Sequence, residues 1–341
     1  MSGSMFEPGR LRLARELKAL SQADLAQRMG VTAAAVSQFE SGAARPSRQT
    51  QEMLGQLLRV PAGFFELPLV DTHEGFFRSL RRTSVPDRRK ARAIAHVAHD
   101  LATHDGAADQ LAAPSIPRLA GEPTARGPDQ VEHIATEVRR VWGIPSGPVR
   151  DMVGLLESHG VVVMRLPLGS ADVDAFSLPF SDRPVVVLSS DKNDRARSRF
   201  DAAHELGHLV MHGEQIWGLP EVEKQAHCFA AAFLMPRDDI YTELPDRADW
   251  PRLFDLKRKW QVSLAALLMR AKTVGRMSDS NYLTAVKAAS ARGWRRTEPV
   301  PLGVPEQPRM LVCLLESPRG AGLRASLPAH VIDALASAVA T

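Results

Sequence analysis

Cysteine is nearly absent from this chain. Only Cys228 and Cys313 occur among 341 residues, and they stand far apart, so the sequence has no disulfide framework of the kind that stabilises small secreted proteins. Long apolar runs are also missing, since no stretch approaches the ~20 residues of a membrane-spanning helix. Residues 1–10 contain no apolar secretory segment. These absences predict a cytoplasmic protein with no membrane partner.

A strong charge of either sign is missing as well. The formal net charge is +4, a mild excess that does not by itself identify a nucleic-acid binder. The hydrophobic content of 44% and the charged content of 24% are those of a soluble globular protein. The length suggests two or three domains, so the function has to come from motifs.

One motif points to metal chemistry. Residues 204–208 read H-E-x-x-H within a segment, 199–212, that is predicted to be helical. Residues four apart share a helix face, so His204 and His208 can point at one metal ion. Glu205 would then lie beside a metal-bound water, where a general base belongs. A packed structural helix is the alternative for an isolated motif, so the surrounding sequence has to decide.

The next question is the third ligand. A catalytic zinc usually has three protein ligands and one open position. The metzincin pattern would require a histidine at position 214, which is Glu214. A gluzincin-like site would instead take a glutamate from a following helix, and Glu223 opens such a segment. Ala226 and Ala230 share its face and are small enough to allow close approach to the first helix.

Together these two segments carry a family resemblance. Residues 199–212 read R-F-x-x-A-H-E-L-G-H-L-x-x-H, and residues 223–236 read E-x-x-A-x-x-F-A-A-x-x-L-M-P. The combination resembles the ImmA/IrrE family of zinc-dependent metallopeptidases over about residues 129–275. The resemblance implies a Zn²⁺ ion held by His204, His208 and Glu223, with Glu205 as the catalytic base and a protein or peptide as substrate.

Further side chains could serve this site. The family commonly has Asn or Asp four residues after the ligand glutamate, whereas this chain has His227, which could orient a zinc-bound imidazole or compete for the metal. His212 extends the same face by a turn and is expected behind the ligands, because a fourth protein ligand would close the catalytic position. Tyr241 and Tyr282, the only tyrosines, are weak candidates for stabilising an oxyanion.

The N-terminal part of the chain predicts a different activity. Residues 8–65 read as four short helices, with Ser21 and Thr32 as N-caps and Gly30 ending the second helix. Two short helices joined by a tight glycine-containing turn form a helix-turn-helix. The motif within residues 21–47 resembles the Cro/repressor-like (XRE) family, and the match covers about residues 8–65. This resemblance implies binding to double-stranded DNA, usually as a homodimer. Its core is predicted from a set of apolar residues: Leu25, Ala26, Val31, Val36 and Phe39.

The resemblance also assigns the DNA contacts. Gln22 is expected at a phosphate, and residues 32–38 in the major groove. Within that stretch Ala33 and Ala34 can touch only a thymine methyl, so direct readout would rest mainly on three polar residues, Thr32, Ser37 and Gln38. Shape readout or dimer spacing would supply the rest. A helical adaptor that binds protein is the alternative.

A basic run follows this domain. Residues 78–92 contain seven basic residues and one acid. The run either extends the phosphate footprint or forms a solvated helix face.

The fold class expected from these parts is α+β, mainly α. An all-helical helix-turn-helix domain precedes a zincin-like metallopeptidase domain with a small sheet and a helical C-terminal part. The expected divisions are 1–66 for DNA binding, 67–128 for a connecting helix and linker, 129–275 for the peptidase, and 276–341 with no assigned role. Short strands are predicted at 161–164, near 173–176 and at 184–188, and residues 310–315 are compatible with another strand.

The two motifs together favour a DNA-binding transcriptional regulator. Such a protein is associated with the nucleoid when it is bound to DNA. By resemblance, its peptidase would cleave a repressor- or antitoxin-type protein in a stress, phage or toxin–antitoxin response. Two alternatives remain: a non-proteolytic transcription factor whose zincin-like domain senses metal or ligand, and a regulator that cleaves itself, with 112–128 as the exposed stretch.

Overall fold

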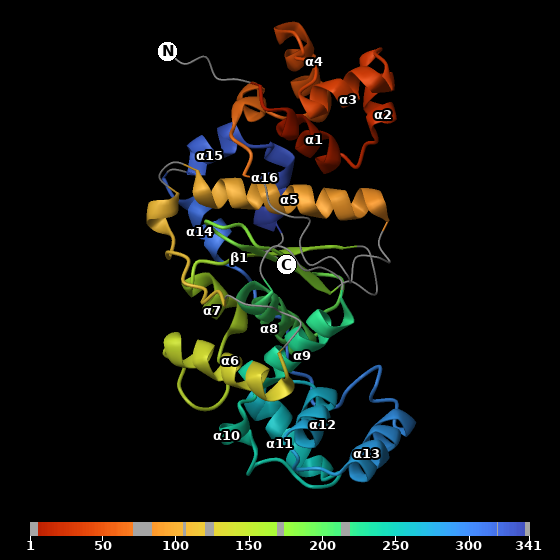
Figure 1. The fold of residues 1–341 in the computed structure, drawn as a ribbon, viewed down its shortest axis with the longest axis vertical. Coiled ribbons are helices and arrows are strands. Elements are labelled where there is room, and N and C mark those ends of the chain that lie inside the picture. Colours follow the sequence, from red (N-terminus) through yellow and green to blue (C-terminus); the bar gives the residue numbers. More distant parts are fainter. Residues whose placement is uncertain are drawn as a thin grey trace. The chain divides into compact units, whose positions relative to one another are not determined.

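The computed structural model describes residues 6–70, 84–104, 107–119, 126–168, 174–212, 219–318 and 320–337 (Figure 1). The chain divides into two compact units, each assembled from separate stretches of sequence. The first comprises Met1–Ser115, Glu157–Asp191 and Pro308–Thr341, and the second comprises Ile116–Leu156 and Lys192–Gln307. None of the described helices is long and apolar enough to cross a lipid bilayer.

The N-terminal helices are confirmed as predicted. They are α1 (Pro8–Leu17), α2 (Gln22–Met29), α3 (Ala33–Ser41) and α4 (Arg48–Leu58), followed by the 3₁₀ turn η1 (Ala62–Glu66). The Ser21 hydroxyl accepts from the Asp24 amide and the Asp24 carboxylate accepts from the Ser21 amide, a capping box that starts α2. Gly30 ends α2 in the left-handed conformation, at a φ of 69°.

A buried ion pair joins the first and third helices. Arg15 donates from Nε to Glu40 Oε1 at 2.6 Å and from Nη2 to Glu40 Oε2 at 2.8 Å. Burial alone would lower the pKa of Arg15, but the hydrogen bonds and charge of Glu40 outweigh it and raise that pKa. The prediction that Val31 lies in the core is wrong, because Val31 is 38% exposed. It lies in the turn between the Gly30 and Thr32 caps and belongs to neither helix.

The rest of the first unit is a small sheet with helices. Its elements are α5 (Val85–Thr103), the 3₁₀ turn η3 (Ala108–Gln110), β1 (Val162–Leu166), β2 (Ala175–Leu178), β3 (Val185–Ser189), α14 (Met310–Glu316), α15 (Gly320–Ser326) and α16 (Ala329–Ser337). The strand order is β1-β3-β2, with β1 parallel and β2 antiparallel to β3. The long helix α5 contacts both β1 and β3.

Residues 310–315, which the sequence leaves compatible with a strand, fall in helix α14. Met310 and Leu311 are buried, as are Leu314 and Leu315, whereas Cys313 is exposed. This spacing buries one side of a helix, and a short apolar run does not by itself distinguish it from a buried strand.

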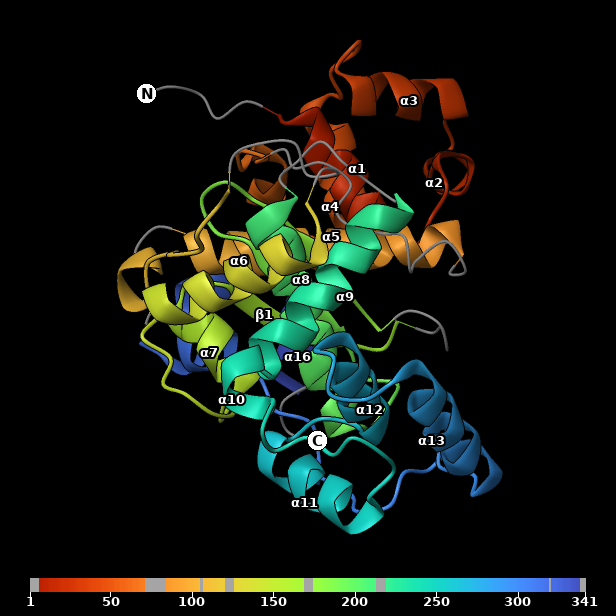
Figure 2. The same ribbon diagram turned by 60° about the horizontal axis from the view of Figure 1, so that its bottom comes forward.

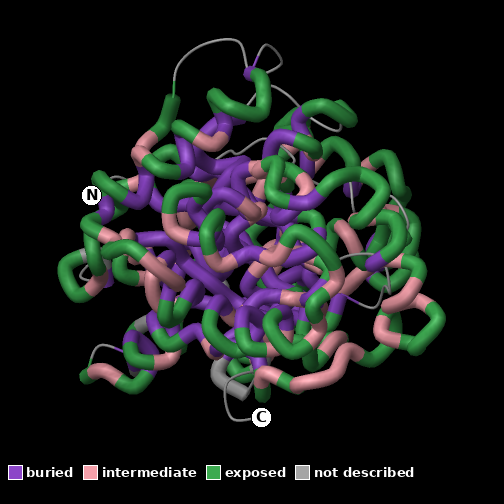
Figure 3. Tube along the Cα trace, turned by 90° about the horizontal axis from the view of Figure 1, so that it is seen from below, coloured by how far each residue is buried: buried purple, intermediate pink, exposed green. Residues whose placement is uncertain are grey.

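The second unit is helical. It contains α6 (Pro128–Val141), the start of α7 (Met152–Ser158), α8 (Arg195–Met211), α9 (Pro220–Leu234), α10 (Arg237–Ile240), α11 (Trp250–Trp260), α12 (Leu264–Thr273) and α13 (Asp279–Ala291). Helix α9 lies beside α8 and also contacts α6 (Figure 1, Figure 2). Most residues of α8 are buried, and such buried stretches alternate with exposed ones along the chain (Figure 3).

Candidate metal centre

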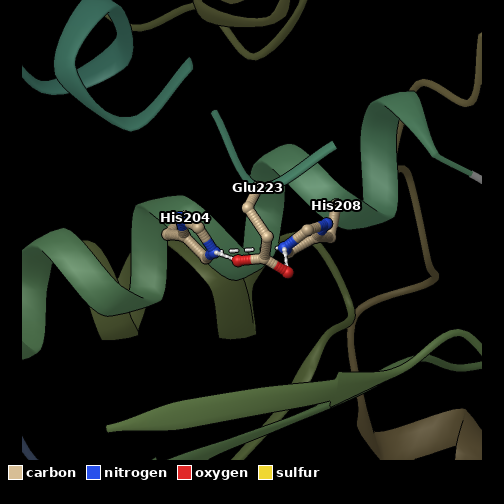
Figure 4. A group of neighbouring side chains, drawn as sticks. All are labelled: His204, His208 and Glu223. Carbon is tan, nitrogen blue, oxygen red and sulfur yellow. Dashed lines mark hydrogen bonds and ion pairs between the residues drawn. The ribbon is translucent and has the colours of Figure 1, made fainter. Parts of the chain in front are cut away.

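Two helices bring three metal-binding side chains together. The Asp194 carboxylate caps α8 by accepting from the Arg197 amide at 3.0 Å, and the helix then places His204 and His208 one turn apart. Glu223 comes from the first turn of α9. One donor atom from each of the three residues lies within 4.8 Å of the other two (Figure 4).

The distances describe a tight triangle. The Nε2 atoms of His204 and His208 are 3.0 Å apart. The Glu223 carboxylate lies 3.5 Å from the nitrogen of His204 through Oε2 and 3.8 Å from that of His208 through Oε1. Figure 4 shows all three groups directed toward one point between the helices.

The donor chemistry fits a zinc ion. Two imidazole nitrogens and one carboxylate are the ligand set of many catalytic zinc sites. Burial lowers the pKa of His208 well below its usual value, and the neighbouring His204, His212 and His227 lower it further. His208 is therefore neutral at pH 7, which is the form that coordinates metal. Glu205 follows His204 on the same helix and is buried.

Glycine at position 207 sets the separation of the two helices. A Cβ atom added to Gly207 would lie 3.0 to 3.1 Å from atoms of Phe229 on α9. Phe229 is fully buried and stacks on Phe233, with ring centroids 5.6 Å apart, so it has little room to move. Ala226 and Ala230 are also fully buried on α9, in agreement with the close approach predicted from the alanines.

A buried ion pair anchors the start of the motif helix. Arg199 donates from Nη1 to Glu306 Oε1, and its Nη2 donates to the Val149 carbonyl at 2.6 Å. The second oxygen of Glu306 accepts from the amides of Met152 and Val153 at 2.8 and 3.2 Å. The sequence motif contains Arg199, but nothing in the local pattern identifies Glu306 as its partner.

A chain of hydrogen bonds lies behind His208. The Nδ1 atoms of His208 and His212 are 2.8 Å apart, and His212 Nε2 is 3.1 Å from Gln225 Oε1. Gln225 Nε2 donates to the Arg126 carbonyl at 3.1 Å. Burial is the main cause that lowers the pKa of His212 to about 4, against the opposing hydrogen bond with Gln225. His212 was expected behind the ligands, whereas Gln225 and Arg126 carry no sequence signal of this role.

His227 lies against the first ligand. Its ring is edge-on to that of His204, at 4.7 Å between centroids and 82° between planes, and 5.5 Å from the ring of Phe200. Burial and the nearby His204 lower the pKa of His227, and they outweigh the hydrogen bond with the Glu223 backbone, which acts to raise it. His227 is not a member of the three-residue cluster.

The two tyrosines make their described ring contacts elsewhere. The Tyr241 ring lies 5.9 Å from the Arg276 guanidinium carbon, and the Tyr282 ring lies 5.2 Å from the Lys272 ammonium nitrogen. Neither described contact involves a residue of the candidate metal site.

The predicted DNA-contact residues gather on an exposed surface. The N-cap of α3 and four residues within this helix are exposed: Thr32, Ala33, Ala34, Ser37 and Gln38. The Thr32 hydroxyl accepts from the Ala35 amide at 3.2 Å as the helix cap. Gln22 is half-buried and donates from Nε2 to Glu40 Oε2 at 2.9 Å, so the buried ion pair also fixes this side chain.

The basic run is described only in part. Residues 78, 81 and 82 lie outside the described residues. Within helix α5, Arg89 lies 4.0 Å from the Glu16 carboxylate, which neutralises part of the charge.

Comparison with protein families assigns both regions. A helix-turn-helix domain matches residues 9–63, and an IrrE N-terminal-like domain of the M78 peptidase family matches residues 156–272. The second match contains His204, His208 and Glu223. A search of the curated proteins finds no match. The chain therefore joins a helix-turn-helix DNA-binding domain to an IrrE N-terminal-like domain with a metallopeptidase-like fold.

Proposed function

We propose that this protein is a transcriptional regulator whose zinc-dependent metalloendopeptidase site cleaves a repressor- or antitoxin-type protein in a stress, phage or toxin–antitoxin response. The observation that carries the proposal is the convergence of His204, His208 and Glu223 from two helices, with a glutamate between the histidines in sequence. It is supported by the IrrE N-terminal-like match over the same residues.

The proposed chemistry assigns a role to each group. His204, His208 and Glu223 would hold the zinc ion, leaving a coordination position open. Zinc bound there supplies Lewis-acid chemistry, lowering the pKa of water and polarising a carbonyl. The Glu205 carboxylate takes a proton from the attacking water as the C–O bond forms, and then delivers it to the amine nitrogen as the C–N bond breaks.

The DNA-binding domain would bring this chemistry to its target. We assign residues 1–66 to DNA binding, with Gln22 at a phosphate and the exposed α3 residues in the major groove of a site bound by a homodimer. Residues 67–128 connect this domain to the peptidase at 129–275. A peptidase recruited in this way meets proteins bound at the same promoter at high local concentration.

Replacing the proposed base tests this function. The zinc-loaded full-length protein is incubated with purified repressor- and antitoxin-type proteins from its own organism, and fragments are identified by mass spectrometry. Glu205→Gln should abolish the cleavage while retaining the zinc content. Glu221→Gln, the same substitution at an exposed position on α9, is the matched control and should cleave as the wild type does. Equal cleavage by the Glu205 variant would contradict the assignment.

The alternatives give different results in the same experiment. A metal-sensing regulator without peptidase activity would yield no fragments, and Glu205→Gln would regulate its promoter normally while His204→Ala would not. A self-cleaving regulator would itself be cut, within residues 112–128.

A further inference from the structure

We infer that a directed chain of hydrogen bonds from the backbone carbonyl of Arg126 sets which ring nitrogen of His208 carries its proton. Gln225 and His212 are then positioning residues of the metal centre. The inference rests on the proposed function in one respect, because it takes His208 as a zinc ligand.

The direction of the hydrogen-bond chain is set by its first member, the Arg126 carbonyl, which can only accept a hydrogen bond. The Arg126 carbonyl oxygen lies 3.1 Å from the side-chain amide of Gln225, so the amide nitrogen must face it. If the Gln225 amide were flipped, its oxygen would face the Arg126 carbonyl oxygen, and two hydrogen-bond acceptors would meet in the protein interior. Gln225 is 2% exposed, so bulk water does not relieve that conflict. The Gln225 oxygen therefore points away from Arg126, toward His212.

Each following bond then has one possible direction. Gln225 Oε1 is 3.1 Å from His212 Nε2, so this nitrogen must carry hydrogen. A neutral imidazole has one N–H and one bare nitrogen, which leaves His212 Nδ1 as an acceptor. His208 Nδ1 lies 2.8 Å from it and must donate.

The outcome is a His208 ring prepared for metal. Its proton is fixed on Nδ1, so the lone pair of Nε2 faces His204 Nε2, 3.0 Å away, and the Glu223 carboxylate. Without the chain, a proton on Nε2 would have to leave before metal could bind. A donor–acceptor chain behind a ligating imidazole also raises its basicity.

Arg126 ties this chain to the helix that carries the histidines. Its guanidinium donates from Nη1 to the Met211 carbonyl at 2.5 Å, at the last residue of α8. The carbonyl that starts the chain is thus held close to His212. Arg126, Gln225, His212 and His208 are all buried, which keeps competing water away from the bonds.

Nitrogen NMR of the metal-free full-length protein observes the tautomer directly. In protein labelled with ¹⁵N-histidine, the His208 signals are identified by their loss in His208→Asn. The wild type should show His208 protonated on Nδ1. Gln225→Met has a similar length but gives up both hydrogen bonds, and should show a substantial population protonated on Nε2.

Zinc affinity gives the second readout. In competition with a chromophoric chelator, Gln225→Met should bind zinc about 10 to 100 times more weakly than the wild type. Leu234→Ala, a truncation of another buried side chain on α9, controls for general loss of packing and should keep the wild-type tautomer and an affinity within about threefold.

A pair of substitutions at position 212 tests the acceptor step. His212→Gln keeps an oxygen that can accept from His208 Nδ1, whereas His212→Met offers only a weak sulfur acceptor. The glutamine variant should retain most of the zinc affinity and the methionine variant should lose it. An equal loss in both would contradict a directed chain.

The inference can fail separately from the proposed function. A wild-type His208 protonated on Nε2, or a Gln225→Met protein with unchanged zinc affinity, overturns the chain and leaves the peptidase proposal intact. A wild-type protein that binds no zinc overturns the zinc assignment, and the NMR measurement on metal-free protein still decides the direction of the chain.

Discussion

Arg199 and Glu306 form a buried ion pair across 107 positions of sequence. Arg199 lies five residues before His204 on α8, and Glu306 lies between α13 and α14, in a segment without regular secondary structure. The carboxylate also accepts from two backbone amides at the start of α7. The pair thus gives residues 276–307, whose role was open from sequence, a structural link to the metal-motif helix.

Removing the charge of Glu306 should destabilise the second unit. Glu306→Gln leaves the guanidinium of Arg199 buried beside a neutral group, which typically costs about 3 to 5 kcal/mol. All five tryptophans belong to the second unit by sequence, so urea unfolding followed by tryptophan fluorescence reports on it. Glu137→Gln removes a carboxylate from an exposed pair with Arg140 in the same unit and should cost at most about 1 kcal/mol. Similar losses in both variants would contradict the buried role.

Filling the space at Gly207 should separate the two ligand helices. Alanine favours a helix by up to about 1 kcal/mol over glycine, but its Cβ would lie 3.0 Å from the Phe229 ring, and overpacking typically costs about 1 to 3 kcal/mol. Gly207→Ala should therefore lower both the free energy of unfolding and the zinc affinity. Adding Phe229→Leu should recover part of each. If Gly207→Ala alone were more stable than the wild type, the Phe229 ring would have to move aside at little cost, and the prediction would be wrong.

The local part of the site follows from sequence rules that act within a turn or two. The spacing of His204 and His208 places both rings on one face of a helix, and small residues on the next helix indicate its close approach to the first. Hydrogen-bonding side chains at Ser21 and Thr32 likewise predict where helices begin. Each of these inferences uses residues that are near neighbours in the chain.

The supporting contacts could not be predicted in this way. Glu306 meets Arg199 across 107 positions, and Gln225 meets the Arg126 carbonyl across 99. Such pairs depend on how the chain returns between distant elements, and neither partner differs locally from an ordinary charged or polar residue. The helix at 310–315 was missed for a related reason, because the local pattern does not say which side of an apolar run is buried.

Acid should destabilise the first unit through His96. This side chain is buried in α5, its ring is 5.0 Å from that of Phe180, and its Nε2 has no hydrogen-bond partner among the described residues. Burial, followed by the charges of Arg92, His99 and Arg10, lowers the pKa of His96 well below 6.5. The unfolded chain therefore binds the proton at a higher pH than the folded chain does. The stability that His96 contributes is complete above about pH 6.5 and is lost as the pH falls below it.

The pH effect can be measured by urea unfolding followed by circular dichroism. Between pH 6.5 and pH 5 the loss due to His96 is at most about 2 kcal/mol, since each pH unit contributes about 1.4 kcal/mol for one proton. His96→Met should show a smaller loss over this interval. His133→Met, at an exposed position on α6, should behave as the wild type does. An unchanged pH dependence in the His96 variant would remove this histidine as the cause.

Gln38 should carry part of the base readout. It is exposed on α3, and its amide can pair with two positions of an adenine edge, which the alanines earlier in the helix cannot do. Gln38→Ala should therefore weaken binding to the selected operator by about 1 to 3 kcal/mol in fluorescence anisotropy. Its binding to random DNA should change little, and the salt dependence should stay the same because no phosphate contact is lost.

The matched control is Gln56→Ala, which removes an exposed glutamine from α4. This variant should bind both DNAs as the wild type does. Equal weakening on operator and random DNA would place Gln38 at the phosphate backbone, and an unchanged operator affinity would show that specificity comes from DNA shape and dimer spacing.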